Sequence, residues 1–406
     1  MKRGELCSGI DERFKMAEIR KPAVKLIQGD RTLFLTAFTV GDFRRRDFYR
    51  VDRLDAQTGE GSQRVLNKAR ARSFCTDILA ADEKNQAFLP TSVFLATGGE
   101  INYDENTKEL FFNTEQHAGI CPLDVVDGQH RIEGLKMAAE KNERLYDFTL
   151  SAVIATQMNE ISRRLQFVTV NTQQEPVRES VKQILIEQFT KDLELEGTRN
   201  DLPHLPTWLK KRAETKKDSN ALRIVRALNN DENCPWYQRV QFADDEKKTT
   251  GIDGMTIKQE SFVKSIIRHI FATGHPLCFE QESKQIAVLK NYWTAVAEIC
   301  VPDSDSQSSI IRCVAFKYSG VNFFHTISSP VIQNLVNKNG DLTVPSIKAC
   351  ISSVEDYLPS QSADLLLPEY WRRGADASGL NAAAIAKKAA DFTSALAQAN
   401  ERSIKI

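Results

Sequence analysis

The sequence predicts a mixed α/β (α+β) domain in the N-terminal half of the chain and a mostly α-helical C-terminal region. Up to about residue 190, short runs rich in β-branched and aromatic residues alternate with helical periodicity, which is typical of such domains. A polar, charged stretch interrupted by Pro203 and Pro206 follows, and the pattern beyond it is mainly helical. We therefore expect two domains, over residues 1–195 and 196–406.

The composition is that of an ordinary globular protein, with 41% hydrophobic and 27% charged residues. Basic and acidic residues balance at 54 each, so any basic binding surface must be local. Eight cysteines are scattered without a Cys-x-x-Cys pair or a metal-binding Cys/His spacing, which predicts reduced thiols of a cytoplasmic protein and no metal site. The charged N-terminus argues against a signal peptide, and no apolar run approaches the ~18 residues of a membrane span.

The elements before residue 160 can be taken in order. The β-branched and aromatic residues from Thr32 to Val40 predict a strand. The remaining expected elements are a helix from Ser62, a buried strand over Phe88–Ala96, a hairpin over Ile101–Asn113 with its turn at Asp104–Thr107, and an extended run over Phe148–Thr156.

The most informative segment is LDVVDGQHRIEGL, residues 123–135, in which an apolar run ends at Asp127 and helical spacing begins at once. We expect Asp127 to be the helix N-cap, and Gly128 to allow a tight turn with space above it. The unpaired amides of this helix N-terminus, beside His130 and Arg131, predict an anion site, most often for phosphate.

Gln129, His130 and Arg131 are three consecutive polar residues at a helix start. They would be poor packing choices, but they suit a phosphate-rich ligand. His130 can act as an acid or base near neutral pH, and Arg131 offers a bidentate fork. The alternative interpretation is structural: Asp127 caps the helix and Arg131 pairs with a neighbouring acid.

An arginine-rich stretch precedes this segment. Residues 43–72 hold nine basic and four acidic residues, a local excess of five positive charges. That bias fits contact with phosphate, of a nucleotide or of a nucleic-acid backbone. Gln63 and Arg64 lie within it, at the expected helix start. An arginine face on a helix is more often simply solvated.

A third candidate follows a short helix expected over Asn159–Leu165. Phe167–Asn171 is expected to be a strand, and a helix should begin at Pro176. Asn171, at the strand end, could bind a ligand or a metal-bound water. An asparagine turn that closes the strand is equally compatible with the pattern.

Other functional classes find little support. The sequence contains neither a P-loop nor a Gly-x-Ser-x-Gly elbow. The isolated histidines are expected to be packed or exposed rather than catalytic, and the tryptophans to be core or interface residues. These residues are His204, His269, His275 and His325, and Trp208, Trp236, Trp293 and Trp371.

The Asp-Gly-Gln-His-Arg run at residues 127–131 resembles the signature of the DGQHR-domain family. That family includes DndB of DNA phosphorothioation systems and DpdB of deazaguanine DNA-modification systems. Its core is similar to the ParB/sulfiredoxin superfamily, whose members place a Gly-x-x-Arg turn against nucleotide phosphates. Ser62–Leu66 resembles the family's Gln-Arg helix start, and Phe167–Asn171 with Gln174–Val177 resembles its strand-to-Asn segment. The resemblance covers about residues 30–190 and does not extend to residues 200–406.

This resemblance implies that ATP and Mg²⁺ are the cofactors and that ATP is hydrolysed. Asp127 and Gly128 would shape the turn, and Gln129, His130 and Arg131 would contact phosphates, with His130 and Arg131 catalytic. The remaining implied contacts come from Gln63 and Arg64, which would close the site, and from Asn171, which would orient phosphate or Mg²⁺.

The leading hypothesis is an ATP-binding and ATP-hydrolysing component of a bacterial DNA-modification or defence system that acts with a partner DNA-modifying enzyme. The helical C-terminal domain would contact DNA or that partner. The alternative is a non-catalytic DNA-binding transcriptional regulator, in which Arg44–Arg72 contacts the DNA backbone. A nuclease ranks last, because no convincing cluster of metal-binding carboxylates is visible. A homo-oligomer, the preferred nucleotide and the DNA modification involved are left open.

Overall fold

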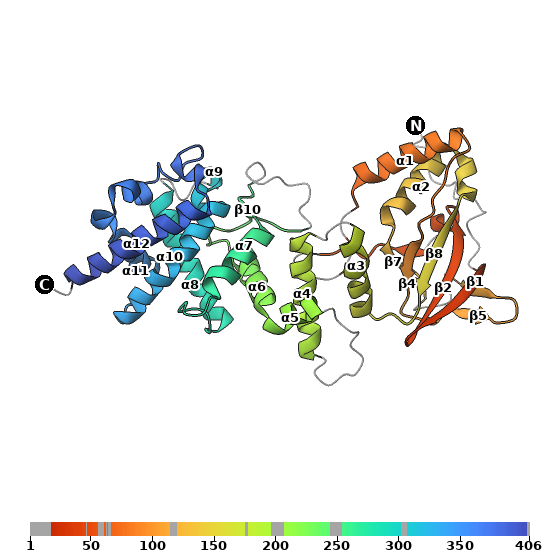
Figure 1. Cartoon of the computed structure of the whole chain (residues 1–406), viewed down its shortest axis with the longest axis horizontal. Coiled ribbons are helices and arrows are strands. Elements are labelled where there is room, and N and C mark those ends of the chain that lie inside the picture. The colour runs from red at the N-terminus through yellow and green to blue at the C-terminus, as the bar shows by residue number, and fades with distance from the viewer. Residues whose placement is uncertain are drawn as a thin grey trace, which may run out of the picture. The chain divides into compact units, whose positions relative to one another are not determined.

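The computed structural model (Figure 1) describes residues 18–45, 47–55, 61, 63, 66–113, 120–174, 178–195, 207–243, 254–301 and 307–403. The chain divides into two compact units. Unit 1 comprises residues 1–177 and 196–205, and unit 2 comprises residues 178–195 and 206–406. The expected boundary after residue 195 differs from this division in two places: α4 (Glu179–Leu195) groups with unit 2, and residues 196–205 group with unit 1. The expected fold class, mixed α/β followed by helices, is confirmed.

Unit 1 is built on an eight-stranded mixed sheet in the order β3-β7-β4-β8-β2-β1-β6-β5. The β3–β7 and β4–β8 pairs are parallel, and the other neighbours are antiparallel. The strands are β1 (Glu18–Gln28), β2 (Arg31–Thr39), β3 (Tyr49–Arg50), β4 (Val93–Ala96), β5 (Asn102–Asp104), β6 (Glu109–Asn113), β7 (Leu123–Asp127) and β8 (Thr149–Ala155). The helices are α1 (Lys68–Glu83), α2 (Gln129–Lys141) and α3 (Glu160–Gln174), with short 3-10 turns η2 (Asp42–Arg44) and η3 (Glu143–Asp147).

The two faces of this sheet differ in how they are covered. Side chains alternate along a strand, so Phe34 and Phe38 of β2 lie on one face and Leu33 and Leu35 on the other. The first face forms the core of unit 1 with α1 and α2, where Leu135 is fully buried. On the second face Leu35 remains 41% exposed. Helix α3 covers only part of that second face, and a pocket lies beside it.

Several local predictions are confirmed. The strand over Thr32–Val40 corresponds to β2, and the Ile101–Asn113 hairpin to β5 and β6. Its turn forms because the Asp104 carboxylate accepts from the backbone N–H groups of Asn106 and Thr107. Strand β1 was not expected, and the strand over Phe88–Ala96 is shorter, beginning at Val93. The helix expected from Ser62 begins at Lys68. Asn67 is its N-cap, because the Asn67 side chain accepts from the backbone N–H groups of Ala69 and Arg70 in the first turn.

The prediction for Phe167–Asn171 is wrong, because these residues continue α3 rather than forming a strand. Ile161, Leu165 and Val168 are buried at helical spacing, which orients one face of α3 inward. Packing of that face outweighs the β-branched composition of the run. Asn171 therefore lies inside a helix instead of at a strand end, and its side chain is outside the described residues.

Unit 2 is mainly helical. Its helices are α4, α5 (Thr207–Thr215), α6 (Lys217–Asn230), α7 (Gln259–Ser265), α8 (Glu282–Cys300), α9 (Gln307–Arg312), α10 (Tyr318–Asn337), α11 (Val344–Ser352) and α12 (Ala382–Ser403). The shorter elements are the π-helical turn η4 (Ile266–Ile270), the 3-10 turns η5 (Val314–Phe316), η6 (Glu355–Tyr357), η7 (Ser360–Leu366) and η8 (Asp376–Gly379), and the parallel pair β9 (Val240–Gln241) and β10 (Ile257–Lys258).

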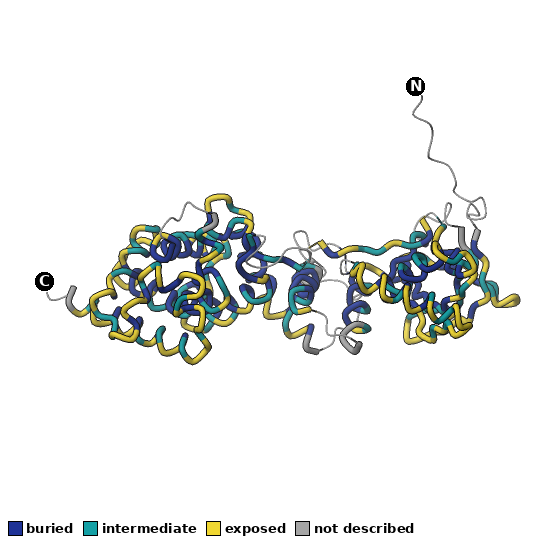
Figure 2. The backbone as a smooth tube through the Cα atoms, turned by 90° about the horizontal axis from the view of Figure 1, so that it is seen from above, coloured by how far each residue is buried: buried dark blue, intermediate teal, exposed yellow. Residues whose placement is uncertain are grey.

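Figure 2 shows buried stretches of backbone along the helices of unit 2. The largest fully buried side chains of this unit are aromatic. The Trp236 and Trp293 rings meet edge to face at 4.9 Å, and Phe262 and Phe316 surround them. Trp371 is buried in the same unit, so the expected core role of these three tryptophans is confirmed. The side chain of Trp208 is outside the described residues.

Two observations bear on the expected chemistry of the chain. Each cysteine in the described part of the chain is a free thiol. Among the described helices, none has the length and apolar composition that crossing a bilayer requires.

Candidate functional site

The expected strand–turn–helix is present where β7 meets α2. Gly128 joins the two elements with φ +101°, a backbone conformation that L-residues rarely adopt. Gly128 itself is the helix N-cap, so the assignment of that position to Asp127 is wrong. The space beside Gly128 is filled, because an added Cβ would lie 2.7 Å from Cγ1 of Val93 and 3.3 Å from Nη2 of Arg131.

Asp127 does not cap the helix because its carboxylate binds Arg131, one helical turn away. Nη2 of Arg131 lies 2.6 Å from Oδ2 of Asp127. Nη1 donates to the carbonyl oxygens of Thr91 and Ser92, at 3.0 and 2.9 Å, and to the Thr91 hydroxyl at 2.7 Å. The guanidinium therefore ties the start of α2 to the segment that enters β4, and a phosphate would have to replace some of these acceptors.

His130 and Gln63 also hold the turn in place. Nε2 of His130 accepts from the backbone N–H of Asn67, the cap of α1, at 3.1 Å. The buried Gln63 amide donates to the carbonyl oxygens of Val125 and Val126, at 2.9 and 2.7 Å. Both side chains thus hydrogen-bond the segment before α1 to the β7–α2 region and hold the turn in position.

The structure therefore brings most of the predicted site residues together. Gln63, Asp127, Gly128, Gln129, His130 and Arg131 gather at the β7–α2 turn. Arg64 lies outside the described residues, as does the side chain of Asn171. Sequence reasoning missed Thr91, Ser92 and Asn67, which bond to the motif from distant segments and carry no local signal of that role.

Gln63→Met tests the structural role of this side chain. We expect the free energy of unfolding to fall by about 1–3 kcal/mol, because two buried carbonyl groups would lose their donor. Urea unfolding followed by far-UV circular dichroism measures this change. Gln28→Met is the control, since Gln28 is exposed, and it should change stability by no more than about 0.5 kcal/mol. Equal stability of the wild-type and Gln63→Met proteins would exclude the role.

The arginine-rich stretch is largely engaged within unit 1. Arg44 stacks over the Tyr146 ring at 4.7 Å, and Arg45 pairs with Asp42 at 3.2 Å. Arg50 binds Asp124 through two guanidinium nitrogens. These contacts leave the exposed face of α1 as the main described basic surface of the stretch, and Arg46 and Arg64 are outside the described residues.

Asp124 is the centre of a second charged group that sequence reasoning did not single out. It is buried in β7, binds Arg50 and forms an ion pair with Arg163, whose Nη1 lies 3.2 Å from Oδ2 of Asp124. Burial, and then the charge of Asp124, raise the pKa of neighbouring Asp52. The one available signal was a carboxylate inside the apolar run LDVVD. Asp124 anchors β3 and α3 to the strand that carries the motif.

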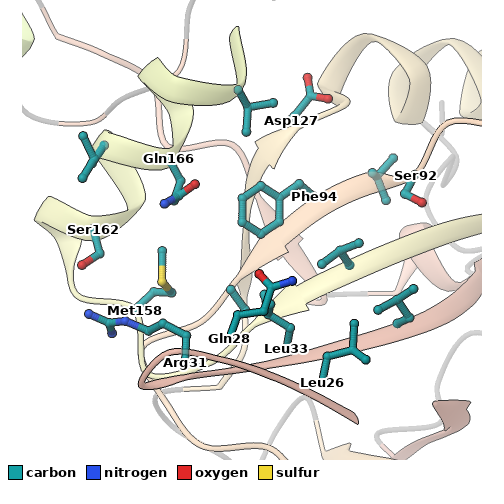
Figure 3. Close-up of a pocket in the computed structure, with 16 residues that line it drawn as sticks. Leu26, Gln28, Arg31, Leu33, Ser92, Phe94, Asp127, Met158, Ser162 and Gln166 are labelled. Atoms are coloured by element: carbon teal, nitrogen blue, oxygen red, sulfur yellow. The ribbon is translucent and has the colours of Figure 1, made fainter. Parts of the chain in front are cut away.

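A pocket of about 600 Å³ opens on the second face of the sheet (Figure 3). Its walls are mostly apolar and come from β1, β2, β4, β8 and α3. Phe94 projects into this space, and Gln166 and Ser162 of α3 face it from the other side. Asp127 and Ser92, which hold or flank the Arg131 guanidinium, line the pocket edge. The pocket and the motif turn are therefore adjacent.

The hydroxyl oxygen of Ser162 is a buried polar atom in the wall of the pocket. Ser162 is only 4% exposed and lines the pocket, yet its Oγ has no hydrogen-bond partner among the described residues. A buried hydroxyl is normally satisfied by protein, water or ligand. A polar group of a bound molecule could bond to this oxygen after rotation of the Ser162 side chain, because the oxygen itself is buried.

The size and walls of the pocket fit the base and sugar of a nucleotide, since ligand pockets range over ~300–1,000 Å³ and combine apolar walls with a few polar groups. Gln28 and Gln166 supply amides that can read a base edge. For Mg²⁺, the described residues contain no group of three His, Cys, Asp or Glu side chains that could hold an ion. Mg²⁺ commonly binds through one or two carboxylates together with substrate phosphates. Asp127 could supply one such carboxylate to a nucleotide-bound Mg²⁺.

Comparison with known families supports the resemblance drawn from the motif. Residues 21–199 match the model of the DndB family, described as DNA-sulfur modification-associated. The match connects this part of the chain with DNA sulfur modification. Comparisons with curated proteins and with solved structures give no significant match, so the similarity to the ParB/sulfiredoxin fold stays a prediction.

Proposed function

We propose, from the match of residues 21–199 to the DndB family, that the chain is an ATP-binding and ATP-hydrolysing component of a DNA phosphorothioation system and acts with a partner DNA-modifying enzyme. The observation that carries the nucleotide part of this proposal is the adjacency of two features. The motif turn provides a helix N-terminus with His130 and Arg131, and the 600 Å³ pocket shares Asp127 with that turn. A ligand with a ring at one end and phosphates at the other matches this arrangement.

In this proposal the base occupies the apolar pocket against Phe94. The Ser162 side chain rotates so that its hydroxyl, which is buried in the unliganded structure, bonds to a base or ribose group. The phosphates extend past Ser92 to the N-terminus of α2, where backbone amides favour anions. Arg131 then exchanges its bonds to the Thr91 and Ser92 carbonyl oxygens for phosphate oxygens. The exchange is electrostatically favourable, because a charged acceptor replaces neutral ones.

Hydrolysis joins a water oxygen to the γ-phosphorus and breaks its bond to the β–γ bridging oxygen, giving ADP and inorganic phosphate. Charge develops on the phosphoryl oxygens, and Arg131 is placed to neutralise it. His130 or Asp127 would orient the water. Mg²⁺, when bound with the nucleotide, supplies further charge neutralisation.

The test compares ATP turnover by the wild-type protein with that of His130→Gln and Arg131→Lys. His130→Gln keeps an acceptor for the Asn67 amide, and Arg131→Lys keeps a positive charge beside Asp127, so both variants should fold. We expect turnover to fall about 100-fold in each, the usual effect of losing a positioned proton-transfer or charge-stabilising group. Lys141→Gln, at the exposed end of the same helix, is the control and should keep full activity.

Ser162→Ala separates ligand binding from folding. Because the hydroxyl has no protein partner, its removal should leave the unliganded stability unchanged. The stabilisation of the wild-type protein by ATP, about 2.7 kcal/mol at 100 times the dissociation constant, should decrease in this variant.

Equal turnover in the wild-type, His130→Gln and Arg131→Lys proteins would contradict the site. Loss of DNA binding on neutralising Lys68 and Arg72, without any ATP effect, would instead favour the non-catalytic regulator.

A further inference from the structure

A cationic surface of unit 2, outside the family match, forms where two backbone segments pair. Cys313 and Arg372 make an isolated antiparallel bridge, and the backbone N–H of Arg373 donates to the carbonyl of Arg312 at 3.0 Å. The bridge therefore brings three arginines from segments about 60 residues apart in sequence onto one strip of surface. A cavity of about 350 Å³ opens beside it, lined by Arg312, Arg372 and Ser309, and none of the described residues that line it is acidic.

Lys317 extends this surface to the start of helix α10. It is the N-cap residue of this 20-residue helix, which has no side-chain cap and no acidic residue in its first turn. The helix N-terminus therefore adds its partial positive charge to that of the side chains. Burial, and then the charge of Arg373, lower the pKa of Lys317, in keeping with the closeness of these two cations.

Among the residues that the structure describes, no acidic side chain pairs with the four cations Arg312, Lys317, Arg372 and Arg373. Within the described part of the chain, none of their side chains forms a hydrogen bond or ion pair. The nearby acids Asp364, Glu369 and Asp376 line a separate cavity around Tyr370. Like charges held close together repel one another, and an anion bound among them would relieve that repulsion.

We propose that this surface binds the phosphate group of a nucleotide unit carried on a nucleic-acid strand. Arginine forks bind phosphate bidentately, and the N-terminus of a long helix favours the same anion. Tyr318 follows Lys317 and is 58% exposed, so its ring is free to stack on a base. A carboxylate ligand would pair with the arginines but would have no base to stack on the Tyr318 ring.

The experiment measures binding of a fluorescent single-stranded oligonucleotide over a salt series. The variant Arg312→Gln/Arg372→Gln/Arg373→Gln should lower affinity about 10-fold or more and reduce the slope of log affinity against log salt by about 2. Tyr318→Ala should weaken binding about 5- to 100-fold, whereas Tyr318→Phe should keep it. A photocrosslink from a 4-thiothymidine oligonucleotide should fall on the peptide that contains Tyr318.

The control, Lys210→Gln/Lys284→Gln/Lys348→Gln, removes the same charge from exposed parts of unit 2 where each lysine already has an acidic partner. It should keep both affinity and salt slope. Inorganic phosphate and a mononucleotide compete in separate arms. If the oligonucleotide binds more tightly than phosphate and the mononucleotide, the phosphate that the surface recognises belongs to a strand. If all three bind equally, the ligand at this site is a free phosphate. Unchanged binding by the arginine variant, or selective binding of polyglutamate, would overturn the proposal.

Discussion

Gly128→Ala is expected to destabilise unit 1 by about 2–6 kcal/mol, a large fraction of the stability of a domain of this size. Two terms contribute. A non-glycine residue at φ +101° costs about 1–3 kcal/mol of backbone strain. The new Cβ would also lie 2.7 Å from Cγ1 of the fully buried Val93, and such overpacking costs a further ~1–3 kcal/mol. Hydrogen exchange of the β7 and α2 amides measures the loss in unit 1.

The two terms can be separated. Gly29 also has a positive φ, +61°, but an added Cβ would meet nothing within 4 Å. Gly29→Ala should therefore show only the backbone term, about 1–2 kcal/mol. Adding Val93→Ala to Gly128→Ala should relieve part of the clash and restore part of the lost stability. The double-mutant cycle should therefore show a favourable interaction energy. If Gly128→Ala cost no more than Gly29→Ala, the close approach of Val93 to the turn would be disproved.

The features that sequence reasoning predicted correctly depend on local chemistry. The hairpin over residues 101–113 forms because Asp104 bonds to amides two and three residues later. The β7–α2 turn needs a positive φ at Gly128, and the sequence has glycine there. The helix expected from Pro176 corresponds to α4, which begins at Glu179, and its residues Val181, Ile184 and Leu185 are buried at helical spacing.

The features that were missed depend on partners distant in sequence. Asp127 can cap a helix or bind Arg131, and the choice depends on where Thr91 and Ser92 hold the guanidinium. The run Phe167–Asn171 has strand composition, but burial of the inner face of α3 makes it helical. The DGQHR residues therefore have a structural role as well as their proposed ligand role, and both must be measured.

Three histidines of unit 2, which the sequence shows as isolated, lie close together in the fold. His269, His275 and His325 bond to serine and threonine hydroxyls, and His325 stacks on Phe262 with ring centroids 5.7 Å apart. Burial lowers the pKa of all three, of His275 to about 4. Neighbouring positive charge adds to this, from Arg268 on His269 and from the other histidines.

The bonding of His275 explains why it resists protonation. Its Nδ1 accepts from the backbone N–H of Leu277 at 3.0 Å, so this nitrogen carries no proton. Its Nε2 lies 3.0 Å from the Ser328 hydroxyl, whose own proton is donated to the His325 carbonyl. The neutral Nε2–H form therefore satisfies every partner. A second proton on Nδ1 would face the Leu277 N–H directly, and the bond would break.

Acidification should therefore destabilise unit 2. A folded-state pKa below the unfolded value means that the unfolded chain binds the extra proton first, so stability is complete above about pH 6.5 and falls as pH decreases. For His275, with a folded pKa of about 4, the loss should be about 1.4 kcal/mol per pH unit between pH 6.5 and 4, or about 3 kcal/mol in total. His325 adds a second loss of the same sign.

Tryptophan fluorescence during urea unfolding reports this loss selectively, because all four tryptophans, at positions 208, 236, 293 and 371, belong to unit 2. In His275→Asn the amide oxygen can still accept from Leu277, but the titrating group is gone. This variant should be less stable at pH 7, because Ser328 loses a donor, yet its stability should decrease less steeply toward pH 5. His130→Gln, in unit 1, should leave the tryptophan-detected curve unchanged. A wild-type stability that stayed constant from pH 7 to pH 5 would show that these histidines are charged or exposed in solution, against the packing described above.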